Sequence, residues 1–106
     1  MATISLTQAD ADRIRTLHVG DSVELRLPEN PSTGYRWSID IALADAATLT
    51  ASRWNAGGSG VGAGGTREFV ITVKEPGTVR LHAKLWREWQ GEGSAIERRE
   101  FTLQVA

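Results

Sequence analysis

The chain has 106 residues, a formal net charge of −1 and no cysteine. This length suits one hydrophobic core, so we treat residues 1–106 as a single domain. Interspersed acidic and basic side chains argue against a nucleic-acid or membrane partner, and the lack of cysteine excludes disulfide and thiolate chemistry. No apolar run approaches the ~18 residues that a membrane-spanning helix needs. The first residues do not resemble a signal peptide, which leaves the cytoplasm and a processed periplasmic or secreted form both open.

Apolar and polar residues alternate along most of the chain. The alternating segments are residues 4–6, 23–27, 35–39, 69–73, 79–85 and 101–105. A period of two is typical of antiparallel strands with one face on a core and the other in water. Only the alanine-rich residues 41–49 can support a helical turn. The pattern predicts an all-β sandwich of seven or eight strands, with a closed barrel as the main alternative.

One turn restricts its backbone at almost every position: Asn30, Pro31, Ser32, Thr33, Gly34 and Tyr35. The residue before a proline is pushed into extended conformations, and the proline itself has a fixed φ. The two hydroxyl groups can bond nearby main-chain atoms, and the glycine can take a positive φ without steric cost. We predict a rigid turn at the mouth of a strand; an ordinary surface turn is the alternative.

Residues 57–65 hold six of the eleven glycines. Such a composition is usual for a flexible linker, but predicted strands lie on both sides of it, which makes it a long loop within one domain. It contains a G-x-G-x-x-G pattern from Gly60 to Gly65. Because a predicted strand follows the pattern where a dinucleotide site requires a helix, we do not interpret it as a nucleotide site.

Four tryptophans are many for this length. Trp37 follows the alternation inward, which predicts a core position, whereas Trp54 ends a strand and is either a lid on the core or part of a rim. Trp86 and Trp89 flank Arg87 and Glu88 in a polar hairpin, and we expect Trp89 to be exposed. Tryptophan and arginine are enriched at binding hot spots. The alternative is that Trp89 covers the end of the core.

Nothing in the sequence indicates catalysis. His18 and His82 occupy polar-facing positions, and neither accompanies a nucleophile motif, a carboxylate pair or a metal-ligand spacing. We therefore predict solvated histidines, no enzymatic activity, no metal and no cofactor.

In a sandwich with hairpin connections, alternate loops collect at the same end. The turn at 30–35, the loop at 57–65 and the hairpin at 87–94 are separated by even numbers of predicted strands. We therefore expect all three at one end, an arrangement typical of a recognition module.

Three motifs resemble those of the chagasin family of cysteine protease inhibitors: residues 30–37, 62–65 and 87–89. That family carries Asn-Pro-Thr-Thr-Gly-Tyr/Phe, Gly-x-Gly-Gly and Arg-Pro-Trp on three adjacent loops of an immunoglobulin-like antiparallel β-sandwich. The match is in the right order and covers essentially the whole chain. Ser32 replaces a family threonine, and Glu88 replaces the family proline, which removes a constraint on φ and adds a charge to the third loop.

The resemblance implies reversible inhibition of papain-family cysteine proteases by a protein that is monomeric when free. The turn would enter the active-site cleft with Thr33 nearest the catalytic thiol, the glycine loop would lie along one side, and Arg87 and Trp89 would clamp the other. The implied protease-binding residues are Asn30, Pro31, Ser32, Thr33, Gly34, Tyr35, Gly62, Ala63, Gly64, Gly65, Arg87 and Trp89.

Fixing each residue of a loop costs about 1–2 kcal/mol. We therefore expect residues 57–65 to be mobile when free and to order on binding, unless Val61 and Ala63 attach them to neighbours. Two alternatives to protease inhibition are carbohydrate binding and a structural role. A carbohydrate-binding module needs exposed, coplanar tryptophans, whereas Trp37 alternates inward, and a structural immunoglobulin-like module does not explain three specialised loops.

Overall fold

The computed structural model describes residues 2–30, 33–42, 46–56 and 64–106. Within these ranges the strands are β1 (Thr3–Thr7), β2 (Ile14–Leu17), β3 (Ser22–Glu29), β4 (Arg36–Ala42), β5 (Ala47–Ala56), β6 (Gly65–Val73), β7 (Gly77–Trp86) and β8 (Glu97–Val105). Short 3-10 turns are η1 (Gln8–Asp10), η3 (Glu88–Gln90) and η4 (Glu92–Ser94). No helix of the described residues is long and apolar enough to cross a membrane.

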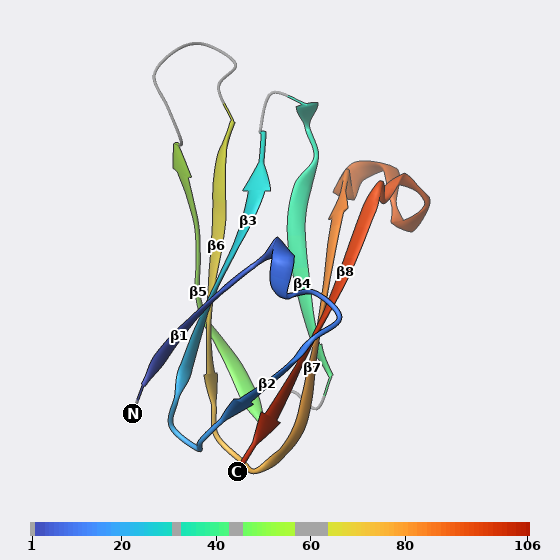
Figure 1. Ribbon diagram of the computed structural model, residues 1–106. Helices are drawn as coiled ribbons and strands as arrows, with labels where there is room; N and C mark the ends of the chain where they lie inside the picture. Colours follow the sequence, from blue (N-terminus) through green and yellow to red (C-terminus); the bar gives the residue numbers. More distant parts are fainter. Residues whose placement is uncertain (1, 31–32, 43–45, 57–63) are drawn as a thin grey trace.

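The strands form two four-stranded sheets, of order β1-β3-β6-β5 and β2-β8-β7-β4, which pack face to face (Figure 1). The predicted sandwich is confirmed, and the closed barrel is not observed. The expectation of antiparallel pairing throughout is wrong at two edges, because β1 runs parallel to β3 and β2 runs parallel to β8. β1 reaches β3 through a crossover that contains β2, and not through a hairpin. Alternation along a strand reports its two faces but not the direction of its neighbour.

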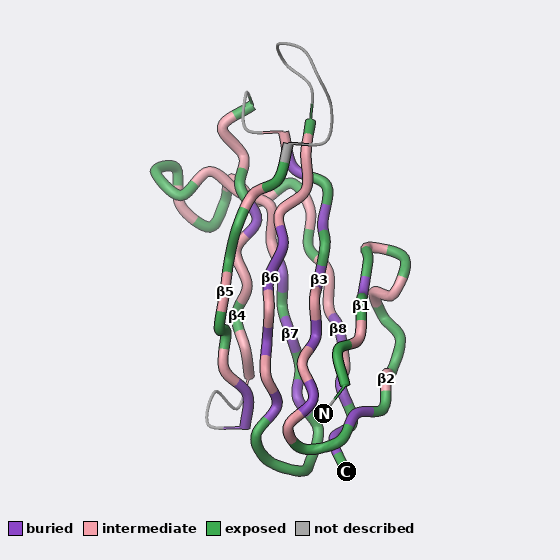
Figure 2. Tube along the Cα trace, turned by 90° about the vertical axis from the view of Figure 1, so that its left-hand side faces the viewer, coloured by how far each residue is buried: buried purple, intermediate pink, exposed green. Residues whose placement is uncertain are grey.

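The core is made of alternate strand residues of both sheets, which are among the buried positions coloured in Figure 2. Its largest side chain belongs to Trp37, which is 2% exposed, so the predicted core position is confirmed. The other large members are Leu6, Leu17, Leu25, Leu27, Phe69, Ile71, Leu81, Phe101 and Leu103. The helical turn considered for residues 41–49 is wrong for the described part, since residues 41–42 and 47–49 lie in β4 and β5.

The strand registers bring three connections to one end of the sandwich. Gly65 is paired with both Glu29 and Ala56, and Arg36 is paired with Trp86. We call this the loop end: β3, β5 and β7 finish there, and β4, β6 and β8 begin there (Figure 1). The strand ends that flank the three predicted loops thus lie at the same end of the sandwich, as predicted from the number of strands between the loops. The opposite end, where β3 and β7 begin and β8 finishes, is the closed end.

Candidate functional site

The turn between β3 and β4 is held by bonds of its own. The Thr33 hydroxyl donates to the Asn30 carbonyl oxygen at 2.8 Å, and the Thr33 amide donates to the same oxygen at 3.2 Å. The Tyr35 amide in turn donates to the Thr33 hydroxyl oxygen at 3.3 Å. Gly34 has a φ of 80°, the positive value that the sequence anticipated. These contacts support a rigid turn; Pro31 and Ser32 lie outside the described residues.

A buried carboxylate lies beneath this turn. Glu29 is only 4% exposed, and its carboxylate accepts the main-chain amide of Trp37 at 2.7 Å. The Arg67 guanidinium donates to the same carboxylate at 2.9 Å and 3.2 Å. One side chain of β3 thereby joins β6 of its own sheet to β4 of the other. Removing one partner of a buried, hydrogen-bonded ion pair strongly destabilises the folded protein, because the other charge stays buried without a partner.

Neither Glu29 nor Arg67 was predicted from the sequence as a functional residue. The alternation could have shown that Glu29 points inward, because Glu29 follows Leu25 and Leu27 at a spacing of two. All three residues are buried. A carboxylate at an inward position needs a partner. Which residue supplies it was not visible, since Arg67 is separated from Glu29 by 38 positions along the chain.

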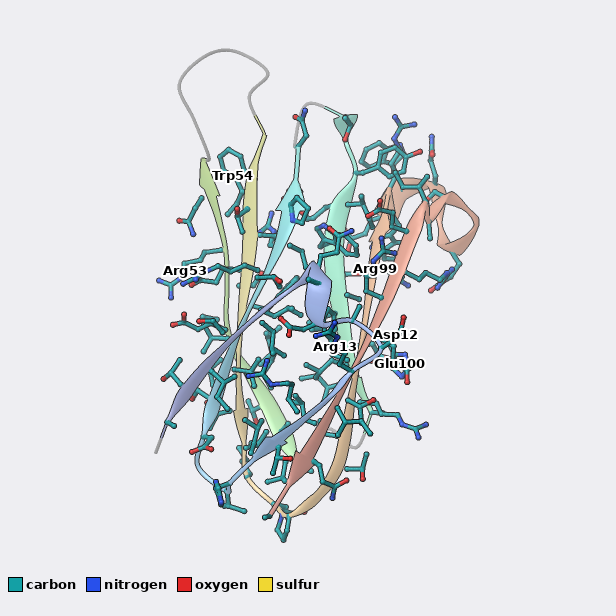
Figure 3. All side chains as sticks on the ribbon, viewed as in Figure 1. Asp12, Arg13, Arg53, Trp54, Arg99 and Glu100 are labelled. Carbon is teal, nitrogen blue, oxygen red and sulfur yellow. The ribbon has the colours of Figure 1, made fainter. Side chains whose placement is uncertain are left out.

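Trp54 covers the start of β6 at the loop end (Figure 3). Its indole nitrogen is 3.5 Å from the Glu29 carbonyl oxygen. A Cβ atom added to Gly65 would lie 2.6 Å from the Trp54 ring and 2.2 Å from the carbonyl oxygen of Asn55, so only glycine fits at position 65. The side chain is half-buried, which makes it a cover over Gly65 rather than a free platform.

The hairpin after β7 reaches across to the turn. The Arg87 guanidinium donates to the Thr33 carbonyl oxygen at 3.0 Å and 3.3 Å, and its central carbon is 4.3 Å from the centre of the Tyr35 ring. Trp89 is 71% exposed, as expected, and the edge of its indole lies over Gly34. Two of the three predicted loops therefore form one continuous surface.

The hairpin itself is internally bonded. The Ser94 hydroxyl accepts the Arg87 amide at 3.0 Å and lies within donating distance of the carbonyl oxygens of Arg87, at 2.9 Å, and Gly91, at 2.7 Å. Glu92 forms ion pairs with Lys84 and Arg98, and these partners hold the pKa of its carboxyl below the ordinary value, Lys84 having the larger effect. Glu88, which replaces the family proline, therefore begins a turn that hydrogen bonds stabilise.

Of the glycine loop, Gly64 and Gly65 belong to the described site. Gly62 and Ala63 lie outside the described residues, and the expected mobility of residues 57–65 stays a prediction. Gly64 is exposed, and an added Cβ there would meet the Glu29 carbonyl oxygen at an ordinary 3.8 Å. Tyr35 lines two hollows, of about 520 Å³ and 420 Å³. The larger is lined by residues that include Trp54 and Trp89, and the smaller by residues that include Gly64, so the three segments adjoin one another.

The four tryptophans differ in exposure, and the histidines belong to no metal-binding group of the described residues. Trp37 is buried, Trp54 and Trp86 are half-buried, and Trp89 alone of the four is exposed, which is not the flat platform of a carbohydrate-binding module. Among the residues that the structure describes, no group of three His, Cys, Asp or Glu side chains is placed to hold a metal ion. The nearest carboxylate oxygen of Glu100 is 3.6 Å from His82, whose side chain is half-exposed.

Comparisons with known proteins agree on the kind of molecule. A family model described as "Chagasin family peptidase inhibitor I42" matches residues 16–105. Chagasin of Trypanosoma cruzi is 32% identical over 105 residues, which cover 94% of each chain. The cysteine protease inhibitor EhICP2 of Entamoeba histolytica has a TM-score of 0.90 at 23% identity, with 100% of this chain and 97% of that one covered. PbICP-C, solved in complex with falcipain-2, has a TM-score of 0.67 at 17% identity, with coverage of 99% and 92%.

Proposed function

The chain belongs to the chagasin family of peptidase inhibitors, and from that premise we propose that its loop end blocks the active-site cleft of papain-family cysteine proteases. It is a cysteine protease inhibitor of immunoglobulin-like fold, and not an enzyme. The observation that carries the proposed site is the bond from Arg87 to the Thr33 carbonyl oxygen. Through it, residues from two motifs that are far apart in the sequence become one surface.

The turn is the central element of the proposed contact. Asn30, Pro31, Ser32, Thr33 and Gly34 would enter the cleft, with Thr33 closest to the catalytic thiol. The Thr33 hydroxyl is already bonded to Asn30 inside the turn, so its role is to fill and obstruct, and not to react. A turn held by its own hydrogen bonds resists distortion into a cleavable conformation and loses little conformational freedom on binding.

The flanking segments would contact the two walls of the cleft. Gly62, Ala63, Gly64 and Gly65 would lie along one wall, where the lack of large side chains permits close main-chain approach. Trp89 would contact the other wall, since a 71% exposed indole offers a large apolar face for stacking on protease aromatics. Tyr35 and Arg87 would lie between these two walls.

Inhibition is tested by titrating papain with the protein and following hydrolysis of a small fluorogenic peptide. We expect activity to fall as the inhibitor is added and to recover after dilution, because no covalent bond is involved. A serine protease assayed in parallel should keep its activity. Full papain activity in the presence of micromolar protein would contradict the proposal.

The place of Thr33 is tested by enlarging it. Thr33→Phe should weaken inhibition because the aromatic ring does not fit against a catalytic thiol, while the melting temperature should change little at an exposed turn. The matched control is Thr78→Phe, an exposed threonine at the start of β7 near the closed end, whose hydroxyl is also hydrogen-bonded. If Thr33→Phe inhibits papain as strongly as Thr78→Phe does, Thr33 does not contact the protease.

A further inference from the structure

The guanidinium of Arg87 is occupied by the chain's own turn. Two of its nitrogens donate to the Thr33 carbonyl oxygen, and its face lies over the Tyr35 ring at 4.3 Å. A planar guanidinium that donates in this forked way and stacks on an aromatic ring is held in one orientation. Arg87 therefore contacts the turn from outside at the peptide that links Thr33 to Gly34.

The space above Gly34 is filled by the same hairpin. A Cβ atom at that position would lie 2.8 Å from the Trp89 ring and 3.6 Å from the Arg87 guanidinium nitrogen. Gly34 also has a φ of 80°, which other residues adopt at a cost. The turn is thus limited on one side by its own bonds to Asn30 and on the other by the hairpin.

The hairpin is in turn anchored at the residue that reaches the turn. The Ser94 hydroxyl bonds the main-chain amide of Arg87 and lies 2.9 Å from the carbonyl oxygen of the same residue. Further along, Glu92 is joined to Lys84 of β7 and Arg98 of β8. Hydrogen bonds therefore join Arg87 to Ser94, the two ends of the hairpin segment 87–94, and fix the main chain from which the guanidinium extends toward the turn.

We propose that Arg87 is a positioning residue, which sets the Thr33–Gly34 peptide in its binding geometry before a protease arrives, and that Ser94 holds Arg87 in place to do so. The inference rests on the proposed inhibitory role of the turn. If only part of the free population has the competent turn, the apparent affinity falls to that fraction of the intrinsic affinity. Loss of Arg87 should therefore act by lowering the population of competent turns.

The test measures the turn in the free protein and inhibition in the complex. Backbone ¹⁵N relaxation of Gly34 and Tyr35, with hydrogen exchange of the Tyr35 amide, reports order without any protease. Arg87→Ala should lower the order parameters, speed exchange and weaken papain inhibition about 10-fold, mainly through slower association. Arg87→Lys keeps the charge but loses the forked pair of hydrogen bonds. Its turn order and its inhibition should lie between those of the wild type and Arg87→Ala. Ser94→Ala should change the same quantities in the same direction by a smaller factor.

The matched control is Arg36→Ala, which removes an exposed arginine at the start of β4 that also lines the hollow beside Tyr35. It should leave the order of the turn unchanged. Weaker inhibition by Arg87→Ala with unchanged turn dynamics and faster dissociation would overturn the proposal and make Arg87 a direct protease contact. Unchanged dynamics and unchanged inhibition would overturn it as well. If the unmodified protein fails to inhibit papain, the proposed function fails, while the relaxation measurements still decide the role of Arg87.

Discussion

Each end of the sandwich contains a buried carboxylate that accepts main-chain amides, but the two carboxylates have different partners. At the closed end Asp21, 5% exposed, accepts the amides of Ala2 and His18, both at 2.9 Å, and these bonds lower the pKa of its carboxyl. At the loop end Glu29 accepts one amide, that of Trp37, and forms a buried ion pair with Arg67.

The other hydrogen bonds at the two ends also differ. The closed end is sealed by main-chain bonds between strands, such as the amide of Gly20 to the carbonyl of Val73 at 2.9 Å and that of Ala106 to Leu17 at 2.8 Å. At the loop end, the Arg87 side chain joins two connections by bonding the carbonyl oxygen of Thr33. The closed end therefore combines bonds between strands with the Asp21 carboxylate, and the loop end adds a side-chain bond between two connections.

The largest effect on stability is expected from Trp37, whose ring fills the core beneath the loop end. Trp37→Ala should cost about 3–5 kcal/mol of the free energy of unfolding, as is typical for a large buried aromatic, and it also removes the indole bond to the Pro28 carbonyl at 2.7 Å. Urea denaturation measures the loss. Trp37→Phe, which keeps most of the apolar ring, should lose much less. A cost for Trp37→Ala within error of zero would contradict the core assignment.

The two buried carboxylates can be compared directly. Glu29→Gln should cost about 3 kcal/mol because it leaves the Arg67 cation buried without its counter-charge. Asp21→Asn should cost less, since the amide oxygen that replaces the carboxylate can still accept a main-chain bond and no buried cation is left unpaired. The double variant Glu29→Gln/Arg67→Met should recover part of the loss. A larger loss for Asp21→Asn than for Glu29→Gln would reverse the comparison.

Acid should weaken the closed end through Asp21. Bonds from the amides of Ala2 and His18 place the folded-state pKa of Asp21 below its ordinary value of 3.8. Its contribution is therefore complete above the unfolded-state pKa and is lost as the pH falls through the lower, folded-state pKa. Glu68 acts in the same sense below its ordinary pKa of 4.5, because a hydrogen bond from Arg26, together with the Arg53 charge, favours its ionised form.

Urea denaturation from pH 7 to pH 2 measures this dependence. The free energy of unfolding should decline below about pH 4.5, and Asp21→Asn and Glu68→Gln should each reduce the steepness of the decline. If both variants follow the wild-type slope, other carboxylates are responsible for the acid sensitivity.

The smallest effect on stability is expected from Trp89, whose loss should strongly weaken inhibition. Trp89→Ala should weaken inhibition by roughly 30-fold, the loss typical of a hot-spot residue, while the melting temperature stays nearly constant because the side chain is 71% exposed. The control is Ile14→Ala on the edge strand β2, 70% exposed, which should change neither quantity. A large fall in melting temperature for Trp89→Ala would identify Trp89 as a cover of the core.

The sequence predicted the strands β1, β3, β4, β6, β7 and β8 from a period of two, together with the inward place of Trp37, and the count of strands predicted that three connections gather at one end. It did not predict β2, and it allowed a helical turn where β5 begins. It did not predict the parallel pairs at β1 and β2, since the pattern carries no direction. Nor did it identify the ion pair of Glu29 with Arg67. The inward phase of Glu29 was visible, but its partner is supplied by strand pairing, which the alternation does not specify.

By itself the sequence determined the local chemistry of the turn: a glycine suited to positive φ and a threonine hydroxyl suited to bonding the main chain. Only the tertiary structure decided that Arg87 bonds Thr33, 54 positions away. The pairing of Arg36 with Trp86 brings their neighbours Tyr35 and Arg87 together at the loop end. The physical reason is that a hydrogen bond acts over about 3 Å, so contacts between distant residues depend on the register and packing of whole strands.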